Sequence, residues 1–213
     1  MNRFGKEIIL VFIAFLLAFV YAWLRYVTFG PYTQYDFLLI LNKATAFSII
    51  LILFLGYSPV KLSELRRDII GKISFFIALA HVIISLILLP TDYYKKYHLS
   101  EGQIMPGFAI ALIFGIISIL SMLAIFQYFR TKEDKKVNYG FFKKLTAFFF
   151  GSLFLHIVFF GYKNWWDPSE WYGGFPPITL ISVIMLLLAI PVAMYFLRKK
   201  MQLQDEDRDA DTE

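Results

Sequence analysis

The chain has 213 residues, of which 59% are hydrophobic and 19% aromatic, and its mean hydropathy is positive. A water-soluble domain of this length needs a mostly polar surface, so the composition excludes a soluble globular protein and indicates a membrane protein. The formal net charge is +5 and there is no cysteine, which excludes disulfides, thiolate-bound iron–sulfur clusters and haem attached through a C-x-x-C-H motif.

Six apolar stretches are long enough to cross about 30 Å of hydrocarbon as helices, which takes roughly 20 residues each. They cover residues 8–28, 37–57, 73–90, 107–128, 145–162 and 178–197. The first stretch lacks a small-x-small cleavage site, so we expect a retained anchor rather than a signal peptide. The sequence therefore predicts an all-α membrane protein, with a six-span bundle over residues 1–200.

The basic residues are unevenly distributed along the predicted bundle. Most of them flank the two ends of the chain and the segments after the second and fourth stretches, whereas the other connections hold only Arg25, Lys95, Lys96 and Lys163. This bias predicts that both termini lie in the cytoplasm. We expect the membrane to be the cytoplasmic membrane of a prokaryote. The positive charge is thus an orientation signal, and a nucleic-acid partner is not expected.

Two segments outside the predicted spans have unusual compositions. The tail 201–213 is acidic and nearly free of apolar residues, so we expect it to be disordered and cytoplasmic. The connection 162–177 carries Trp165, Trp166 and Trp171. Such residues are typical of an aromatic belt at the membrane interface, and the alternative is a docking surface or a lid over a cofactor edge on the outer side.

The third predicted span carries a histidine on a face of small residues. His81 lies about 14 Å along the helix from its basic inner end, which is near the centre of the bilayer. Ser74, Ala78 and Ser85 share its helical face. This pattern leaves room for a flat macrocycle to approach the backbone, and it would equally suit tight helix packing.

The fifth span carries a second histidine at a similar depth. His156 lies roughly 18 Å along this span, which runs outward like the third. Two imidazoles at one depth in hydrocarbon predict the axial ligands of a single b-type haem, with His81 and His156 on opposite sides of the iron. The alternative is that each imidazole is only hydrogen-bonded to a neighbouring helix.

A cation is predicted inside the second span. Lys43 lies about 10 Å into this span from the outer side, where a charged amine must pair or extend its side chain toward the surface. It could meet a haem propionate. No Asp or Glu falls inside a predicted span, which argues against a cation-coupled carrier, and no motif for a flavin or nicotinamide site is present.

Several short motifs resemble the ferric-reductase-like transmembrane superfamily, nearest its haem-binding membrane subunit of the bacterial methionine sulfoxide reductase system. They are Leu55-Gly56-Tyr57-Ser58-Pro59-Val60, the pair Arg66-Arg67 followed by Gly71, Phe75-Phe76 and Ala80-His81, and Lys143-Lys144-Leu145 leading to Leu155-His156. The resemblance covers residues 42–191. The family usually has a further histidine near the inner end of the fifth span, and this chain has none there, so the resemblance implies one haem at most.

Together these patterns predict a membrane haem protein that passes electrons within or across the bilayer. The electron donor would be a quinone or a separate reductase, and an acceptor or protein partner would lie on the outer face. The chain would then be the electron-transfer subunit of an oxidoreductase. The alternative is a haem-free structural or assembly subunit of a larger membrane complex, and a small-solute transporter ranks third because no repeated half is present.

Overall fold

The computed structural model describes residues 5–33, 36–57, 67–90, 97, 104–130 and 138–210. Over these ranges the fold is helical. The helices that could span a membrane are α1 (Gly5–Trp23, continued by the π-helical turn η1, Leu24–Thr28), α2 (Phe37–Tyr57), α3 (Arg67–Leu88), α4 (Pro106–Arg130), α5 (Tyr139–Gly161) and α6 (Ile178–Ala210). The six-span prediction is therefore confirmed in the part of the chain that the structure describes.

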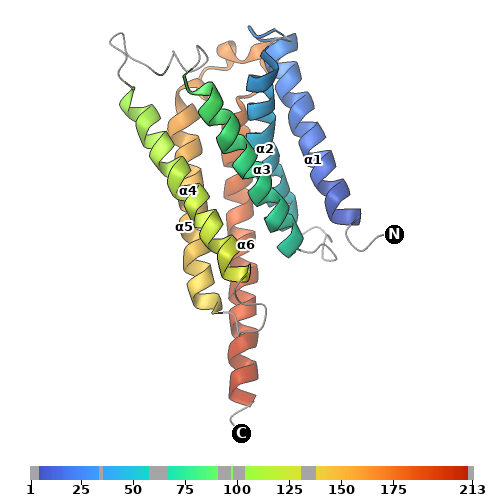
Figure 1. Ribbon diagram of the computed structural model, residues 1–213, viewed down its shortest axis with the longest axis vertical. Coiled ribbons are helices and arrows are strands. Elements are labelled where there is room, and N and C mark those ends of the chain that lie inside the picture. The colour runs from blue at the N-terminus through green and yellow to red at the C-terminus, as the bar shows by residue number, and fades with distance from the viewer. Residues whose placement is uncertain are drawn as a thin grey trace.

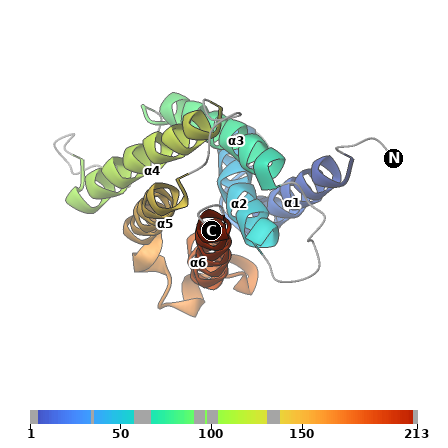
Figure 2. The same ribbon diagram turned by 90° about the horizontal axis from the view of Figure 1, so that it is seen from below.

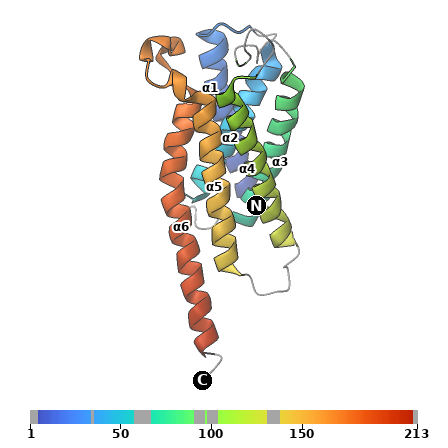
Figure 3. The ribbon, with the colours of Figure 1, turned by 90° about the vertical axis from the view of Figure 1, so that its left-hand side faces the viewer.

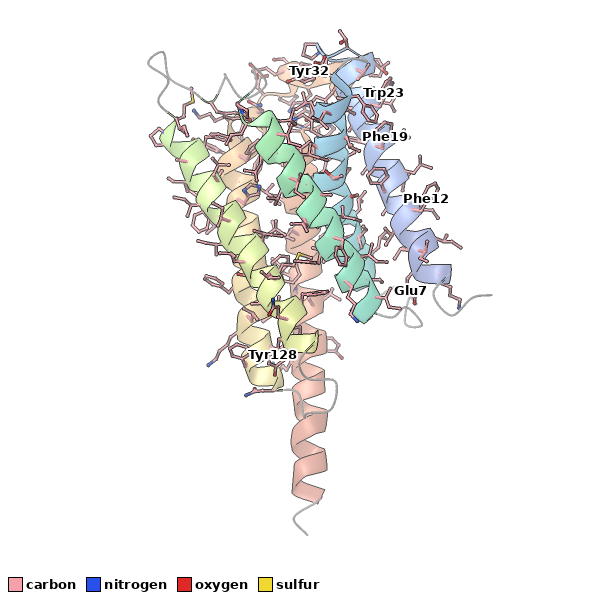
Figure 4. The ribbon with its side chains drawn as sticks, in the orientation of Figure 1. Glu7, Phe12, Phe19, Trp23, Tyr32 and Tyr128 are labelled. Atoms are coloured by element: carbon pink, nitrogen blue, oxygen red, sulfur yellow. The ribbon has the colours of Figure 1, made fainter. Side chains whose placement is uncertain are left out.

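Consecutive helices run in opposite directions, so the N- and C-termini lie at the same end of the bundle (Figure 1). We call this the terminal end and the opposite one the far end. The C-terminal part of α6 projects beyond the other helices at the terminal end (Figure 3). Large side chains such as Phe12 (64% exposed) and Leu86 (62%) are exposed, as expected of helices that contact lipid, and Figure 4 shows Phe12 pointing away from the bundle.

Small residues let α1 approach α2 closely. Ala14, Ala18 and Ala22 recur every fourth residue on one face of α1, and none has any exposed surface. They pack against an apolar face of α2 that includes Ile40 and Phe47. Close backbone approach through small side chains is a common way to associate helices in a membrane, where lipid removes the hydrophobic drive between them.

Helix α2 is the central element of the bundle. It packs against α1, α3 and α6, while α4 and α5 pair on the other side and α6 closes the arrangement (Figure 2). Side chains from α2 to α6 form one core cluster, which includes Ile49, Phe75, Phe149, Phe150 and Leu186.

The segment between α5 and α6 is folded over the far end, next to the end of α1 (Figures 1 and 3). It contains three short 3₁₀ turns, and Gly173 adopts a φ of 60° where Phe29 leaves no room for a Cβ atom. Trp165 donates a hydrogen bond to Thr179 at 2.9 Å, whereas Trp166 is 82% exposed. Only some tryptophans of the segment between α5 and α6 therefore face outward.

Three boundaries differ from the prediction by six residues or more. Helices α3 and α5 begin at Arg67 and Tyr139, earlier than residues 73 and 145, and α5 is capped by Asn138, whose side chain accepts a hydrogen bond from the backbone of Phe141. Helix α6 continues to Ala210, so the expected disorder of the tail 201–213 is wrong for residues 201–210. That stretch contains neither Pro nor Gly, and its charged and unbranched residues suit a helix.

The expectation of no carboxylate inside a span also needs correction. Helix α1 begins at Gly5, so Glu7 lies in its first turn and is 3% exposed. Its position at the terminal end is labelled in Figure 4. A carboxylate in the first turn of a helix is favoured by the helix dipole, which explains why an acidic residue is accepted there.

Candidate functional site

The two predicted histidines both hydrogen-bond to the backbone of a neighbouring helix. His81 on α3 lies with its Nδ1 atom 3.2 Å from the carbonyl oxygen of Asn42 on α2. His156 on α5 lies with its Nδ1 atom 2.7 Å from the carbonyl oxygen of Ala111 on α4. A carbonyl oxygen can only accept, so Nδ1 carries the proton in both rings. Each neutral imidazole therefore keeps the lone pair of its Nε2 atom for another partner.

This tautomer is the one that metal-binding histidines use. A histidine that ligates a metal through one ring nitrogen usually donates the other N–H to a carbonyl or carboxylate, which fixes the orientation of the ring. Both imidazoles are half-buried, and they lie close enough to each other to interact electrostatically. The two predicted nitrogen donors therefore share one tautomer and lie within electrostatic range of each other, on α3 and α5.

A glycine on α4 makes room for the ring of His156. A Cβ atom on Gly115 would lie 2.8 Å from Nδ1 and 3.0 Å from Cε1 of His156. Ala111, which accepts the hydrogen bond, lies one turn away on the same face of α4 and has no exposed surface. Gly115 could not be predicted as a site residue, because the role of a glycine inside a span depends on the rotation of its helix.

On the other side, Asn42 joins two residues of the α3 face to α2. Its backbone carbonyl faces His81, and its side-chain Oδ1 accepts a hydrogen bond from Ser85 at 3.1 Å. Ser85 was predicted to leave room for a macrocycle, and in the structure its hydroxyl is used for packing against α2. Asn42 is 4% exposed, so both bonds are formed away from lipid and water.

The other two small residues of this face are buried. Ala78 belongs to the core cluster, and Ser74 has no exposed surface. The Oγ atom of Ser74 has no hydrogen-bond partner in the described part of the chain. A buried hydroxyl without a partner is uncommon, so this atom offers a donor to a group that would enter the interior from outside the chain.

Apolar side chains lie on both sides of the histidines along the helix axes. Toward the terminal end, Phe75 on α3 and Phe149 and Phe150 on α5 belong to the core cluster. Toward the far end, Phe160 lies with its ring centroid 6.1 Å from that of His156, and Phe108 packs against it. The imidazoles therefore sit in a low-dielectric interior, where polar contacts are strong and water is largely excluded.

Lys43 does not point at the histidines. Its Nζ atom lies 4.5 Å from the ring centroid of Tyr26 in η1, although it is near enough to His81 for an electrostatic interaction. Of the motif residues given above, Ser58-Pro59-Val60 and Arg66 lie outside the described residues, as do Lys95 and Lys96 of the charge argument.

The donor set fits a porphyrin better than a bare metal ion. Over the described ranges, no group of three or more His, Asp or Glu residues could hold a metal ion. A porphyrin supplies four of the ligands of its iron, so two axial imidazoles are sufficient. Two Nε2 lone pairs with fixed tautomers and an unpartnered buried hydroxyl are consistent with this group.

Comparison with models of known protein families and with curated proteins finds no match. The resemblance to the ferric-reductase-like superfamily therefore stays a prediction from the motifs, and the site is interpreted from its own geometry.

Proposed function

We propose that this chain is a b-type haem protein of a prokaryotic cytoplasmic membrane, in which the Nε2 atoms of His81 and His156 bind the iron. One observation carries the proposal: both rings donate Nδ1–H to a backbone carbonyl and lie in one interior, which leaves two Nε2 lone pairs available. Bound haem would supply one-electron redox chemistry.

The protein's own contribution is to orient the two histidine ligands and to enclose the bound haem. The carbonyls of Asn42 and Ala111 fix the rotation of the two rings, and Gly115 permits the close approach of His156 to α4. Aromatic side chains on both sides of the histidines exclude water. The buried hydroxyl of Ser74, which has no partner in the described part of the chain, would be available to donate to a bound group.

The orientation of the bundle in the membrane supports electron transfer toward an acceptor on the outer side. The described helix ends at the terminal end carry the basic residues Lys6, Lys72, Lys143 and Lys144, so the positive-inside bias favours a cytoplasmic location for this end. Electrons would come from a quinone or a separate reductase, because the sequence contains no recognisable flavin or nicotinamide motif. The acceptor or partner would lie at the far end.

The test is a visible absorption spectrum of the purified protein, oxidised and then reduced. A b-type α band is expected in the wild type and should be lost in His81→Ala and His156→Ala. His98→Ala is the matched control, since it removes the remaining histidine of the chain and should keep the band. Full haem content in the His81 and His156 variants would contradict the proposal.

A further substitution separates ligation from packing. In His156→Asn the side-chain amide can still donate a hydrogen bond toward the carbonyl of Ala111, but it is a poor ligand for iron. We expect this variant to unfold close to the wild-type apoprotein temperature and to contain no haem. If this variant lacked haem and also unfolded at a lower temperature than the wild-type apoprotein, the loss of haem would be explained by disturbed packing.

A haem-free structural subunit is the second candidate, and one observation favours it. Each imidazole already has an interhelical hydrogen bond, which is a sufficient reason for a histidine inside a membrane bundle. A colourless preparation that co-purifies with other subunits, and that takes up no added haemin, would select this function.

A further inference from the structure

Two basic side chains lie together inside the far end of the bundle. Arg25 belongs to the π-helical turn η1, and Lys43 belongs to the neighbouring helix α2. Both approach the ring of Tyr26, with Arg25 Cζ at 5.3 Å and Lys43 Nζ at 4.5 Å from its centroid. The two cations are close enough to repel each other electrostatically.

The aromatic surroundings stabilise these cations only in part. Arg25 also lies over the ring of Tyr172, 5.2 Å from its centroid, and one of its NH groups donates to the carbonyl oxygen of Phe175. Tyrosine rings and a carbonyl favour a cation, but they carry no net negative charge. Two like charges in a low-dielectric environment remain uncompensated by these contacts.

The guanidinium of Arg25 keeps an unused donor. Arg25 is 4% exposed, and its Nε atom is buried without a hydrogen-bond partner in the described part of the chain. Neither Arg25 nor Lys43 forms an ion pair with a carboxylate of the described ranges. Buried guanidinium groups normally have their donors satisfied, so the Nε–H group of Arg25 is available to an acceptor oxygen.

Local backbone structure points to the same place. A π-helical turn is rare, and such turns occur frequently at functional sites. In η1 this turn places Arg25 on the buried face that Ala14, Ala18 and Ala22 form along α1. Lys43 is half-buried whereas Arg25 is 4% exposed, so of the two basic side chains Lys43 is the one with surface open to the bilayer interface.

We propose that Arg25 and Lys43 form an oxyanion site at the far end of the bundle, which binds a phosphate or carboxylate group. The source is either an anionic lipid headgroup or a free anion, since both present the same acceptor oxygens. The site does not depend on the proposed haem, because its residues come from η1, α2 and the segment before α6.

The experiment compares thermal unfolding of the full chain in nanodiscs. The two lipid arms are phosphatidylcholine alone and phosphatidylcholine with phosphatidylglycerol, and a third arm adds inorganic phosphate, at constant ionic strength, to phosphatidylcholine discs. Lys43→Met removes the charge at similar length. Lys163→Met is the matched control, because Lys163 is an exposed lysine at the same end of the bundle.

A rise in unfolding temperature with phosphatidylglycerol alone assigns the site to a lipid headgroup, and a rise with inorganic phosphate assigns it to a free anion. In either case Lys43→Met should weaken the apparent affinity about ten-fold or more, and Lys163→Met should leave it unchanged. The haem-free variant His156→Asn, which leaves the contacts of α2 unchanged, should keep the response. No rise in any arm, an equal rise in Lys43→Met, or loss of the response in His156→Asn would overturn the proposal.

Discussion

The close approach of His156 to α4 gives the sharpest quantitative prediction, which concerns Gly115→Ala. The added methyl group would lie 2.8 Å from Nδ1 and 3.0 Å from Cε1 of His156, well inside van der Waals contact. The hydrogen bond to Ala111 holds the imidazole against the same face of α4, so the ring cannot move away from the added methyl group without weakening that bond. The strain and the hydrogen bond therefore act on the same ring.

The expected magnitude follows from opposing terms. Replacing glycine by alanine inside a helix gains about 0.5–1 kcal/mol through the backbone. Overpacking a well-filled interior costs about 1–3 kcal/mol, and leaving the Nδ1–H group of His156 without its acceptor costs about 1–3 kcal/mol more. We expect Gly115→Ala to lower the free energy of unfolding by about 1–5 kcal/mol and to reduce haem content, because the ring no longer holds its orientation.

The assay is unfolding in detergent, followed by tryptophan fluorescence, together with the haem-to-protein ratio. Gly151→Ala is the matched control: it lies on α5 close to His156 in sequence, and nothing lies within 4 Å of the position of its Cβ atom. This control should be as stable as the wild type or slightly more so. If Gly115→Ala matched Gly151→Ala in both measurements, the packing argument for His156 would be refuted.

Two further predictions concern the packing of α1. Ala18→Leu places a large side chain at a position with no exposed surface against α2, so it should lower the unfolding temperature in detergent, whereas Leu17→Ala, at a position that is 56% exposed, should change it little. Tyr21→Phe removes a hydrogen bond of 2.7 Å to the carbonyl of Pro176 and should cost about 1 kcal/mol, with faster proteolysis of the segment 162–177 as the measurement.

The spans could be predicted because their signal is carried by composition alone. Runs of apolar residues have to cross a fixed thickness, so their number and approximate position follow from the sequence. The helix ends could not be predicted in this way, because a helix can continue beyond the hydrocarbon wherever its residues favour helical structure. The terminal part of α6 is such a case: its acidic composition predicted disorder, but the stretch to Ala210 is helical.

The site could be predicted only as a set of candidates. Sequence spacing gave the depths of His81 and His156, but their hydrogen-bond partners depend on the rotation of α3 and α5. Gly115 was missed for this reason, and the aromatic partner of Lys43 was not predicted. Tyr26 reaches Lys43 from η1, and the π-helical geometry of that turn has no signature in the sequence.

The two candidate sites meet at one turn of α2. Asn42 and Lys43 are adjacent, and successive residues of an α-helix point about 100° apart, so they face different neighbours. Asn42 holds the histidine face of α3, whereas Lys43 faces η1 and Arg25. A rotation of α2 that strained one set of contacts would therefore strain the other. Helix α2 is also the element with the most buried span, which makes such a rotation costly and gives both sites a rigid common support.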